Sequence, residues 1–271
     1  MTIRIAMWSG PRNISTAMMR SFSSRADCAV SDEPFYGAFL KATGEPHPLA
    51  AETIASMDCN WHSVLAAQSG AVPGGKPVWY QKHMPHHMVG PVGIADMPRH
   101  RHAFLIRAPE RVVASYRAKN ELRAPGMLGF GQMRRYFEHE AERTGMAPPV
   151  VDSDAVLADP AGVLARLCGA LGIAWDPAML SWERGPHPED GVWGGHWYDK
   201  VNASTGFGDP AGTMPLLDGD YRAVADACRE DYEALRRHAL PGQGGVAIAD
   251  RTSIPDDNDN GSPASRRRKE A

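Results

Sequence analysis

A short polar stretch near the N-terminus has the residue types needed to bind an anion. The apolar run 3–8 leads into Ser-Gly-Pro, and Arg12, Ser15 and Thr16 follow, with Ser15 the expected N-cap of a helix over residues 15–24. A helix N-terminus offers free N–H groups and the positive end of the dipole, and an arginine adds a bidentate fork. An ordinary structural turn remains the alternative for this motif alone. The Gly-Lys-Ser/Thr signature of nucleoside-triphosphate loops is missing here.

A second arginine and serine follow a later apolar run. In FLIRAPERVVAS, Arg107 ends a predicted strand and Ser115 lies eight residues on, in the helix that Pro109 opens. This spacing lets both side chains reach one anion at the carboxyl end of the strand. The alternative is an arginine paired with a carboxylate and a serine that faces solvent.

Alternating strand and helix patterns predict how these residues are positioned. We expect strands over residues 3–8, 28–31, 76–83, 101–107 and 148–152, and helices over 51–68 and 221–239 and after Asp159-Pro160. This order is typical of an α/β fold with a parallel sheet and helices on both faces. Ligands bind beyond the carboxyl ends of such strands. The segment 185–215, rich in Gly, Trp and Pro, is expected to be a long ordered loop that serves as a lid.

The composition of the chain is that of a globular protein without a membrane span, a disulfide framework or a zinc site. The chain has 271 residues, 43% of them hydrophobic and 23% charged, and a net charge of −3. We expect one α/β domain over residues 1–248 and a disordered polar and basic tail over 249–271. Four separated cysteines suggest neither a disulfide framework nor a zinc site. No run has the length of a membrane span or the form of a signal peptide, so we expect a cytoplasmic protein that does not bind membranes.

The positive charge is concentrated in one part of the chain. Between residues 99 and 143 there are ten Arg and Lys against five Asp and Glu. Either this is a solvated helical face or it is a surface for an anion. A nucleic-acid groove is disfavoured, because the excess is local and lacks interleaved aromatic residues.

Taken together, these motifs resemble the sulfotransferase superfamily, whose donor is 3′-phosphoadenosine-5′-phosphosulfate (PAPS). Residues 11–16 are similar to the loop Pro-[Lys/Arg]-Ser-Gly-[Ser/Thr]-[Ser/Thr], which grips the 5′-phosphosulfate in that family. Arg107, Pro109 and Ser115 are similar to its 3′-phosphate element, and the stretch from residue 150 resembles its late strand and helix. The resemblance covers residues 3–240. It implies a three-layer, P-loop-like fold with a central parallel sheet, PAPS as co-substrate and no metal.

The resemblance also implies roles for individual residues, with departures. Asn13 and Ile14 replace the serine and the glycine of the family's loop. Arg12 would stabilise the leaving nucleotide. His83, in YQKHMP, matches the catalytic histidine of cytosolic sulfotransferases, although Gln81 replaces the lysine of that element. Glu33, in SDEPF, matches the glutamate base of carbohydrate sulfotransferases. We favour His83 as the base, with Glu33 orienting it or replacing it.

A late loop completes the expected donor site, and the acceptor remains open. Lys200, Ser204 and Thr205 are expected near the nucleotide, and Trp193, Trp197 and Tyr198 either line an acceptor pocket or pack in the core. The acceptor is expected to be a small molecule with a hydroxyl or an amine. Two alternatives remain: a P-loop kinase or nucleotide hydrolase, with Asp32 as the acidic metal ligand, and a non-catalytic nucleotide-binding relative.

Overall fold

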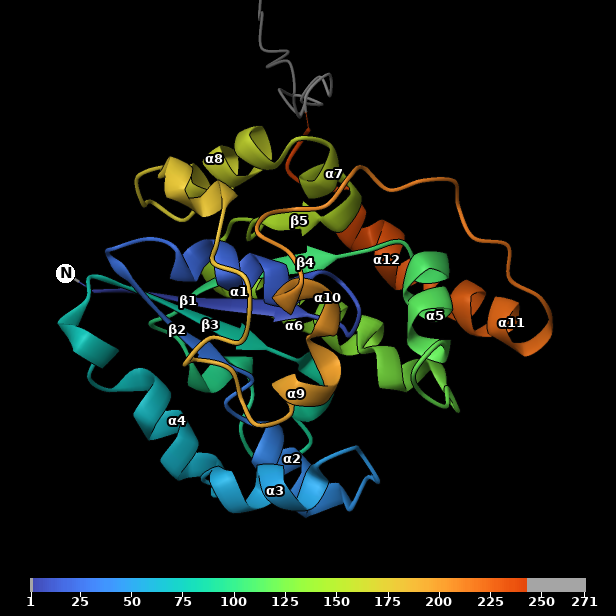
Figure 1. The fold of residues 1–271 in the computed structure, drawn as a ribbon, viewed down its shortest axis with the longest axis horizontal. Helices are drawn as coiled ribbons and strands as arrows, with labels where there is room; N and C mark the ends of the chain where they lie inside the picture. Colours follow the sequence, from blue (N-terminus) through green and yellow to red (C-terminus); the bar gives the residue numbers. More distant parts are fainter. Residues whose placement is uncertain (1, 243–271) are drawn as a thin grey trace, which may run out of the picture.

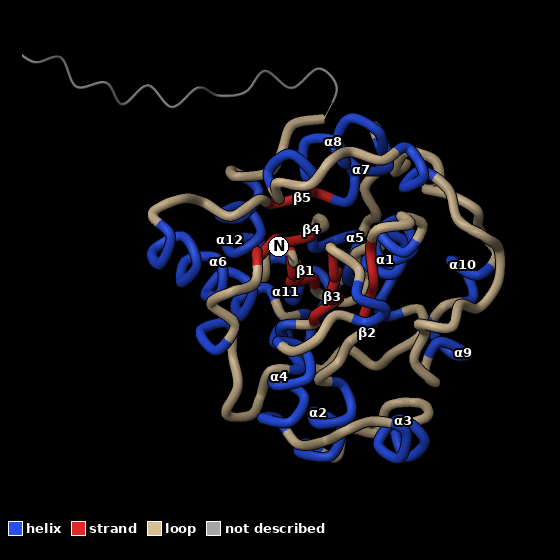
Figure 2. The backbone as a smooth tube through the Cα atoms, turned by 90° about the vertical axis from the view of Figure 1, so that its left-hand side faces the viewer, coloured by secondary structure: helices blue, strands red, loops and turns tan. Residues whose placement is uncertain are grey.

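A parallel sheet forms the centre of the molecule. The computed structural model describes residues 2–242, so the predicted boundary at residue 248 and the predicted tail lie outside the described residues. Five strands pair in parallel in the order β2-β3-β1-β4-β5 (Figures 1 and 2). Their bounds are β1 Ile3–Ser9, β2 Cys28–Asp32, β3 Val78–His83, β4 Arg101–Ile106 and β5 Val150–Asp152.

Alternate residues of β1 face two different cores. Ile5 and Met7 pack with apolar side chains of α1 (Ser15–Ser23), α7 (Ser153–Ala158) and α8 (Pro160–Ala170). Ala6 and Trp8 pack on the opposite face with α4 (Trp61–Ser69), α5 (Pro109–Arg117), α6 (Phe130–Thr144), α11 (Gly219–Ala227) and α12 (Arg229–Arg236). The predicted three-layer α/β fold is therefore confirmed. Both faces of β1 are apolar because both are covered by helices.

The remaining helices complete these layers and the region beyond the strand ends. They are α2 (Tyr36–Thr43), α3 (Ala50–Ser56), α4 (Trp61–Ser69), α5 (Pro109–Arg117), α6 (Phe130–Thr144), α9 (Gly194–Trp197), α10 (Asp199–Asn202), α11 (Gly219–Ala227) and α12 (Arg229–Arg236). In Figure 1, α2 and α3 lie together at one end of the molecule, and α9 lies between them and the sheet.

Two helices predicted as continuous are divided. The predicted helix 51–68 is split into α3 and α4, because the Asn60 side chain accepts hydrogen bonds from the His62 and Ser63 amides and starts α4 as its N-cap. The predicted helix 221–239 is split at Cys228 into α11 and α12. The helix predicted after Asp159-Pro160 is α8, and the Asp159 side chain caps it by accepting a hydrogen bond from the Gly162 amide.

The predicted lid segment is partly helical. It contains the short helices α9 and α10. Across residues 2–242, no helix combines the length and the apolar character needed to cross a membrane.

Candidate active site

One cavity lies at the carboxyl ends of the strands and collects most of the predicted site residues. Its volume is about 550 Å³. The segments after β1, β2, β3 and β4 all contribute to its wall, as expected for a parallel sheet. The predicted residues that line it are Arg12, Asn13, Ile14, Ser15, Thr16, Glu33, Arg107, Ser115, Lys200 and Ser204.

The backbone of this cavity is strained at three places. Among the described residues, four that are not glycine have positive φ, and Arg12 (63°), Ile14 (56°) and Glu33 (45°) are three of them. A β-branched residue such as Ile14 is seldom found in this region. Ile14 thus adopts the left-handed conformation that a loop glycine would favour. Strain of this kind persists where the surrounding structure holds it, commonly at functional sites.

The predicted cap of α1 is wrong by one residue. Ile14 is the N-cap and Ser15 is the first helical residue. Isoleucine has no side-chain acceptor, so its side chain leaves the first amides of α1 without a cap. Ser15 and Thr16 line the cavity in that first turn. The helix end therefore offers N–H groups and hydroxyls to an anion.

Asn13 holds the loop in place. Its side chain is buried and donates a hydrogen bond to the Leu105 carbonyl at 3.1 Å. The Asn13 carbonyl in turn accepts a hydrogen bond from the Ser153 hydroxyl at 3.0 Å. These contacts tie the loop after β1 to β4 and α7.

The two predicted anion-binding motifs meet directly. Arg12 Nε donates to Ser115 Oγ at 3.0 Å, and Arg107 Nη1 donates to the Arg12 carbonyl at 2.9 Å. Burial lowers the pKa of both guanidinium groups, which nevertheless stay charged at any physiological pH. Arg107 Nε is buried without a hydrogen-bond partner in the described part of the chain, and Asp154 Oδ1 lies 4.0 Å away. The two arginines are thus a concentrated positive patch beside the end of α1.

A buried cation lies at the other side of the helix end. Lys82 Nζ is 2.7 Å from Glu33 Oε1 and 2.9 Å from Asp32 Oδ1, and it donates to Thr16 Oγ1 at 3.3 Å. Burial opposes the charge of Lys82, but the carboxylates of Asp32 and Glu33 outweigh it and raise the lysine pKa well above its usual value. Lys82 is therefore an ammonium ion that links the first turn of α1 to Glu33.

His83 does not line this cavity. The register pairs Met7 with Lys82 and Trp8 with His83, so Lys82 lies on the α1 face of the sheet and His83 on the opposite one. The His83 ring is 1% exposed and stacks on Trp8 at 4.8 Å. Burial lowers its pKa well below the usual value. The His83 ring therefore does not face the cavity, whereas Glu33, the other predicted base, lines it.

The wall beyond Glu33 is built from rings. Tyr36 and His87 stack at 4.6 Å, and Trp193 meets Tyr36 edge-on at 5.1 Å. His87 Nδ1 lies 3.8 Å from Glu33 Oε2. Burial holds the pKa of His87 and His86 well below the usual value, so both rings are neutral. Tyr36, His86 and His87 were not named as pocket residues, because they follow the motifs SDEPF and YQKHMP directly but belong to neither.

The late segment closes the cavity on its remaining side. Lys200 and Ser204 line it, while the Ser204 hydroxyl donates to the Val201 carbonyl and accepts from Trp182 Nε1. Trp193, Trp197 and Tyr198 are also lining residues. Thr205 is not, and its carbonyl accepts a hydrogen bond from the Trp182 amide. In residues 2–242, no group of three or more His, Cys, Asp or Glu side chains is arranged to hold a metal ion.

Comparison with known proteins identifies the family. The family model described as "Sulfotransferase domain" matches residues 3–239, and the chain therefore belongs to the sulfotransferase domain family. A solved sulfotransferase from Alicyclobacillus acidocaldarius shares the fold, with a TM-score of 0.52 and 11% identity over 89% of this chain and 98% of that one.

Two curated plant proteins are also similar in sequence. Branched-chain-amino-acid aminotransferase-like proteins 1 and 2 of Arabidopsis thaliana are 37% and 35% identical over 239 and 237 residues. In each case the match covers 86% of this chain but only 42% and 41% of the plant protein. The chain thus spans about two fifths of their length, and their names describe proteins more than twice as long as the matched part.

Proposed function

We propose that this member of the sulfotransferase family transfers a sulfuryl group from PAPS to a hydroxyl group of a small molecule. The observation that carries the proposal is the convergence of two anion-binding motifs and a carboxylate–ammonium pair on one cavity. Arg12, Ser15, Thr16 and the first turn of α1 bind the 5′-phosphosulfate. Arg107 and Ser115 bind the 3′-phosphate. Charge-assisted contacts of this kind suit a donor that is anionic at both positions.

Glu33 is the general base in this proposal. It lies at the boundary between the anion-binding residues and the ring-lined wall, where the acceptor hydroxyl must approach the sulfur. Its second oxygen, Oε2, is 3.8 Å from a neutral imidazole and remains free to accept a proton from the acceptor. Lys82 holds the first oxygen and orients the carboxylate.

The transfer follows from this arrangement. The acceptor oxygen forms a bond to sulfur as its proton passes to Glu33, and the bond from sulfur to the bridging oxygen of the 5′-phosphate breaks. The electron pair stays on that oxygen, so negative charge develops on the leaving 3′,5′-adenosine bisphosphate. Arg12 and the ammonium of Lys82, 3.3 Å from Thr16 Oγ1, stabilise this charge.

The acceptor is a ring-containing, uncharged alcohol in this proposal. Stacked and edge-on rings of Tyr36, His87 and Trp193 offer flat surfaces, and the buried imidazoles carry no charge. A charged acceptor would lose its hydration without a partner in this wall. A neutral hydroxyl meets Glu33 without that cost.

Calorimetric titration tests the donor assignment. The purified protein is titrated with 3′,5′-adenosine bisphosphate and, as a control, with ATP and magnesium. We expect binding of the bisphosphate and at least ~10-fold weaker binding of ATP, because Arg107 and Ser115 are placed for a 3′-phosphate and no Gly-Lys-Ser/Thr loop is present.

Two results would contradict the proposal. Preference for ATP would favour a kinase or nucleotide hydrolase. Binding of the bisphosphate without release of sulfuryl groups from PAPS to any ring alcohol would favour a non-catalytic nucleotide-binding protein.

A further inference from the structure

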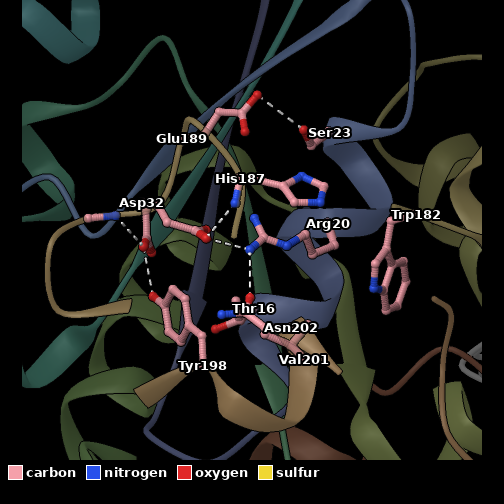
Figure 3. A network of polar contacts seen from close by, with 12 residues as sticks. Thr16, Arg20, Ser23, Asp32, Trp182, His187, Glu189, Tyr198, Val201 and Asn202 are labelled. Atoms are coloured by element: carbon pink, nitrogen blue, oxygen red, sulfur yellow. Dashed lines mark hydrogen bonds and ion pairs between the residues drawn. The ribbon is translucent and has the colours of Figure 1, made fainter. Parts of the chain in front are cut away.

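The late segment, defined here as residues 183–205, is anchored to the sheet and to α1 by buried polar contacts (Figure 3). Lys82 and Tyr198 line the cavity themselves, and the proposed mechanism does not use the contacts that the late segment makes with Asp32 and Arg20. They connect the late segment to α1, whose first turn is proposed to bind an anion, and to the end of β2, next to the proposed base Glu33. The segment is therefore part of the site's framework.

The first anchor joins Tyr198 to the carboxylate of Asp32. Tyr198 Oη donates to Asp32 Oδ2 at 2.7 Å and accepts from Lys82 Nζ at 2.8 Å. The Gly191 amide also donates to Asp32 Oδ2, at 3.4 Å. The side chains of Asp32 and Lys82 are both 1% exposed. Lys82 thus has one acceptor supplied by the late segment.

The second anchor joins the same segment to α1. The buried Arg20 of α1 donates to Asp190 Oδ2 at 2.5 Å and to Asn202 Oδ1 at 3.3 Å. Asp190 Oδ2 also accepts a hydrogen bond from the His187 amide at 2.9 Å. Figure 3 shows Arg20 reaching across to the late segment beside the Tyr198–Asp32 contact. The two anchors together seat the late segment so that the Tyr198 hydroxyl reaches Asp32.

One ammonium group serves two carboxylates in this cluster. Lys82 has three N–H donors, and its acceptors at 2.7–2.9 Å are Glu33, Asp32 and Tyr198. A buried carboxylate that loses a donor attracts the remaining donors more strongly, because unsatisfied charge in a dry site is costly. Asp32 without the Tyr198 hydroxyl would therefore draw Lys82 away from Glu33.

We propose that Tyr198 and Asp32 are positioning residues. Together they keep the ammonium of Lys82 in contact with both Asp32 and Glu33, and so they hold Glu33 ionised and oriented to accept the proton of the acceptor. The inference rests on the proposed sulfuryl transfer. The Tyr198 hydroxyl donates a hydrogen bond to Asp32, so that Asp32 does not draw Lys82 out of its contact with Glu33. Because Tyr198 belongs to the late segment, the base is correctly set only when that segment is seated.

Several titratable groups surround Glu33 and must be considered in a pH experiment. The His87 and His47 imidazoles have pKa values lowered by burial and are neutral, and burial raises the pKa of Tyr36 and of Tyr198. Burial also raises the pKa of Asp32, while Lys82 and the Tyr198 hydrogen bond act in the opposite direction. The charge next to Glu33 therefore depends on Lys82 and on Asp32, which competes for it. The groups that face Glu33 from its own and neighbouring elements are Asp32, Tyr36, His47, Lys82, His87 and Tyr198.

Two variants with opposite expected effects test the proposal. PAPS is incubated with 2-naphthol and 4-nitrophenol, release of 3′,5′-adenosine bisphosphate is followed, and kcat is measured against pH with the better acceptor. In Tyr198→Phe we expect kcat to fall about tenfold and its acidic limb to move to higher pH, because a carboxylate with a more distant cation binds its proton more tightly. In Asp32→Asn the competitor loses its charge, so the acidic limb moves to lower pH. The dissociation constant of the bisphosphate changes less than about threefold in both variants.

A matched control separates positioning from stability. Tyr232 Oη donates to Asp152 Oδ2 at 2.8 Å, which is the same kind of buried contact in a place that does not line the cavity. Tyr232→Phe should lower the thermal midpoint about as much as Tyr198→Phe and leave the pH profile unchanged.

The outcomes distinguish this inference from the proposed function. Suppose that the wild type is active. An unchanged pH profile in Tyr198→Phe, or shifts in the same direction in both variants, would then overturn the inference but not the proposed function. A wild type that binds the bisphosphate but transfers nothing would overturn the proposed function, and the inference with it. If the loss of activity in Tyr198→Phe is explained wholly by weaker binding of the bisphosphate, Tyr198 does not position the base and only closes the donor site, which would overturn the inference.

Discussion

Two regions meet at the end of β3, and adjacent residues of that strand belong to different ones. Lys82 faces the cavity with Glu33, whereas His83 faces a buried cluster that we call the histidine core, formed by Trp8, His83, His100 and His102. In the cavity wall, the ammonium of Lys82 is paired with the carboxylates of Asp32 and Glu33. In the histidine core, rings stack and remain neutral. Position on the sheet, rather than residue type, separates the residue that lines the cavity from its neighbour that packs in a core.

Polar bonds inside the histidine core show how imidazoles are used for packing. Trp8 Nε1 donates to His102 Nδ1 at 3.0 Å, and His102 Nε2 bonds the Met97 carbonyl at 3.1 Å. His83 Nε2 lies 3.2 Å from Gln81 Oε1. Both ring nitrogens of His102 and one of His83 are thus hydrogen-bonded within the protein, which is what a buried polar group needs. The cavity differs because Glu33 Oε2 and the end of α1 are left for a ligand.

The largest expected effect is on kcat, and it should differ between a substitution in the cavity and one in the histidine core. Glu33→Gln should reduce kcat by ~10²–10⁴-fold, because the general base is lost, while binding of 3′,5′-adenosine bisphosphate persists. His83→Gln should change kcat by less than about fivefold and lower the thermal midpoint. Steady-state kinetics with PAPS and calorimetry measure both. The opposite pattern, an inactive His83→Gln beside an active Glu33→Gln, would return the base to His83.

The second effect concerns the donor side of the cavity. Arg107→Ala should weaken binding of 3′,5′-adenosine bisphosphate by about 10–100-fold, because a charge-assisted contact contributes roughly 1.5–3 kcal/mol. Binding of 5′-AMP, which lacks the 3′-phosphate, should be nearly unchanged. Arg117→Ala removes the same charge from α5 at a half-exposed position paired with Asp218 and serves as the control. Equal losses for the two nucleotides would refute the assignment of Arg107 to the 3′-phosphate.

The smallest effect concerns the pH stability of the histidine core. Burial lowers the pKa of His102 from its usual 6.5 to about 4. As the pH falls, His102 is therefore protonated in the unfolded state before it is protonated in the folded state. The contribution of the neutral His102 to the free energy of unfolding is complete above pH ~6.5 and is lost as the pH falls towards ~4. From these values His102 alone should cost about 2 kcal/mol at pH 5 relative to pH 7.5.

Urea unfolding at pH 7.5 and pH 5 measures this loss. The variant His102→Gln should show a smaller difference between the two pH values than the wild type, because one buried base is gone. An identical difference in both proteins would assign the acid sensitivity to other groups. Activity at neutral pH should survive the substitution, which would confirm that the histidine core is structural.

The α/β class and the residues proposed to bind anions could be predicted because they depend on local patterns, whereas the spatial order of the strands was not predicted. Apolar runs that alternate with helical patterns indicate a parallel sheet, and Arg12, Ser15, Arg107 and Ser115 each follow a strand. The cap of α1 was misplaced because Ile14 holds a left-handed conformation that no propensity rule assigns to isoleucine. The breaks at Asn60 and Cys228 were missed because apolar periodicity continued across them.

The amino-acid sequence alone determined the α/β class, the order of the elements along the chain and the two motifs proposed to bind anions, since these depend on residues close together in the chain. Only the tertiary structure decided that Lys82, and not His83, faces the cavity, because a strand's two faces are distinguished by what packs on each of them. The same holds for Asp32, Lys82 and Tyr198, which lie up to 166 positions apart and meet only when the late segment folds back onto the sheet. Contacts between distant segments carry no local signal, and the environment of Glu33, the proposed base, is made of such contacts.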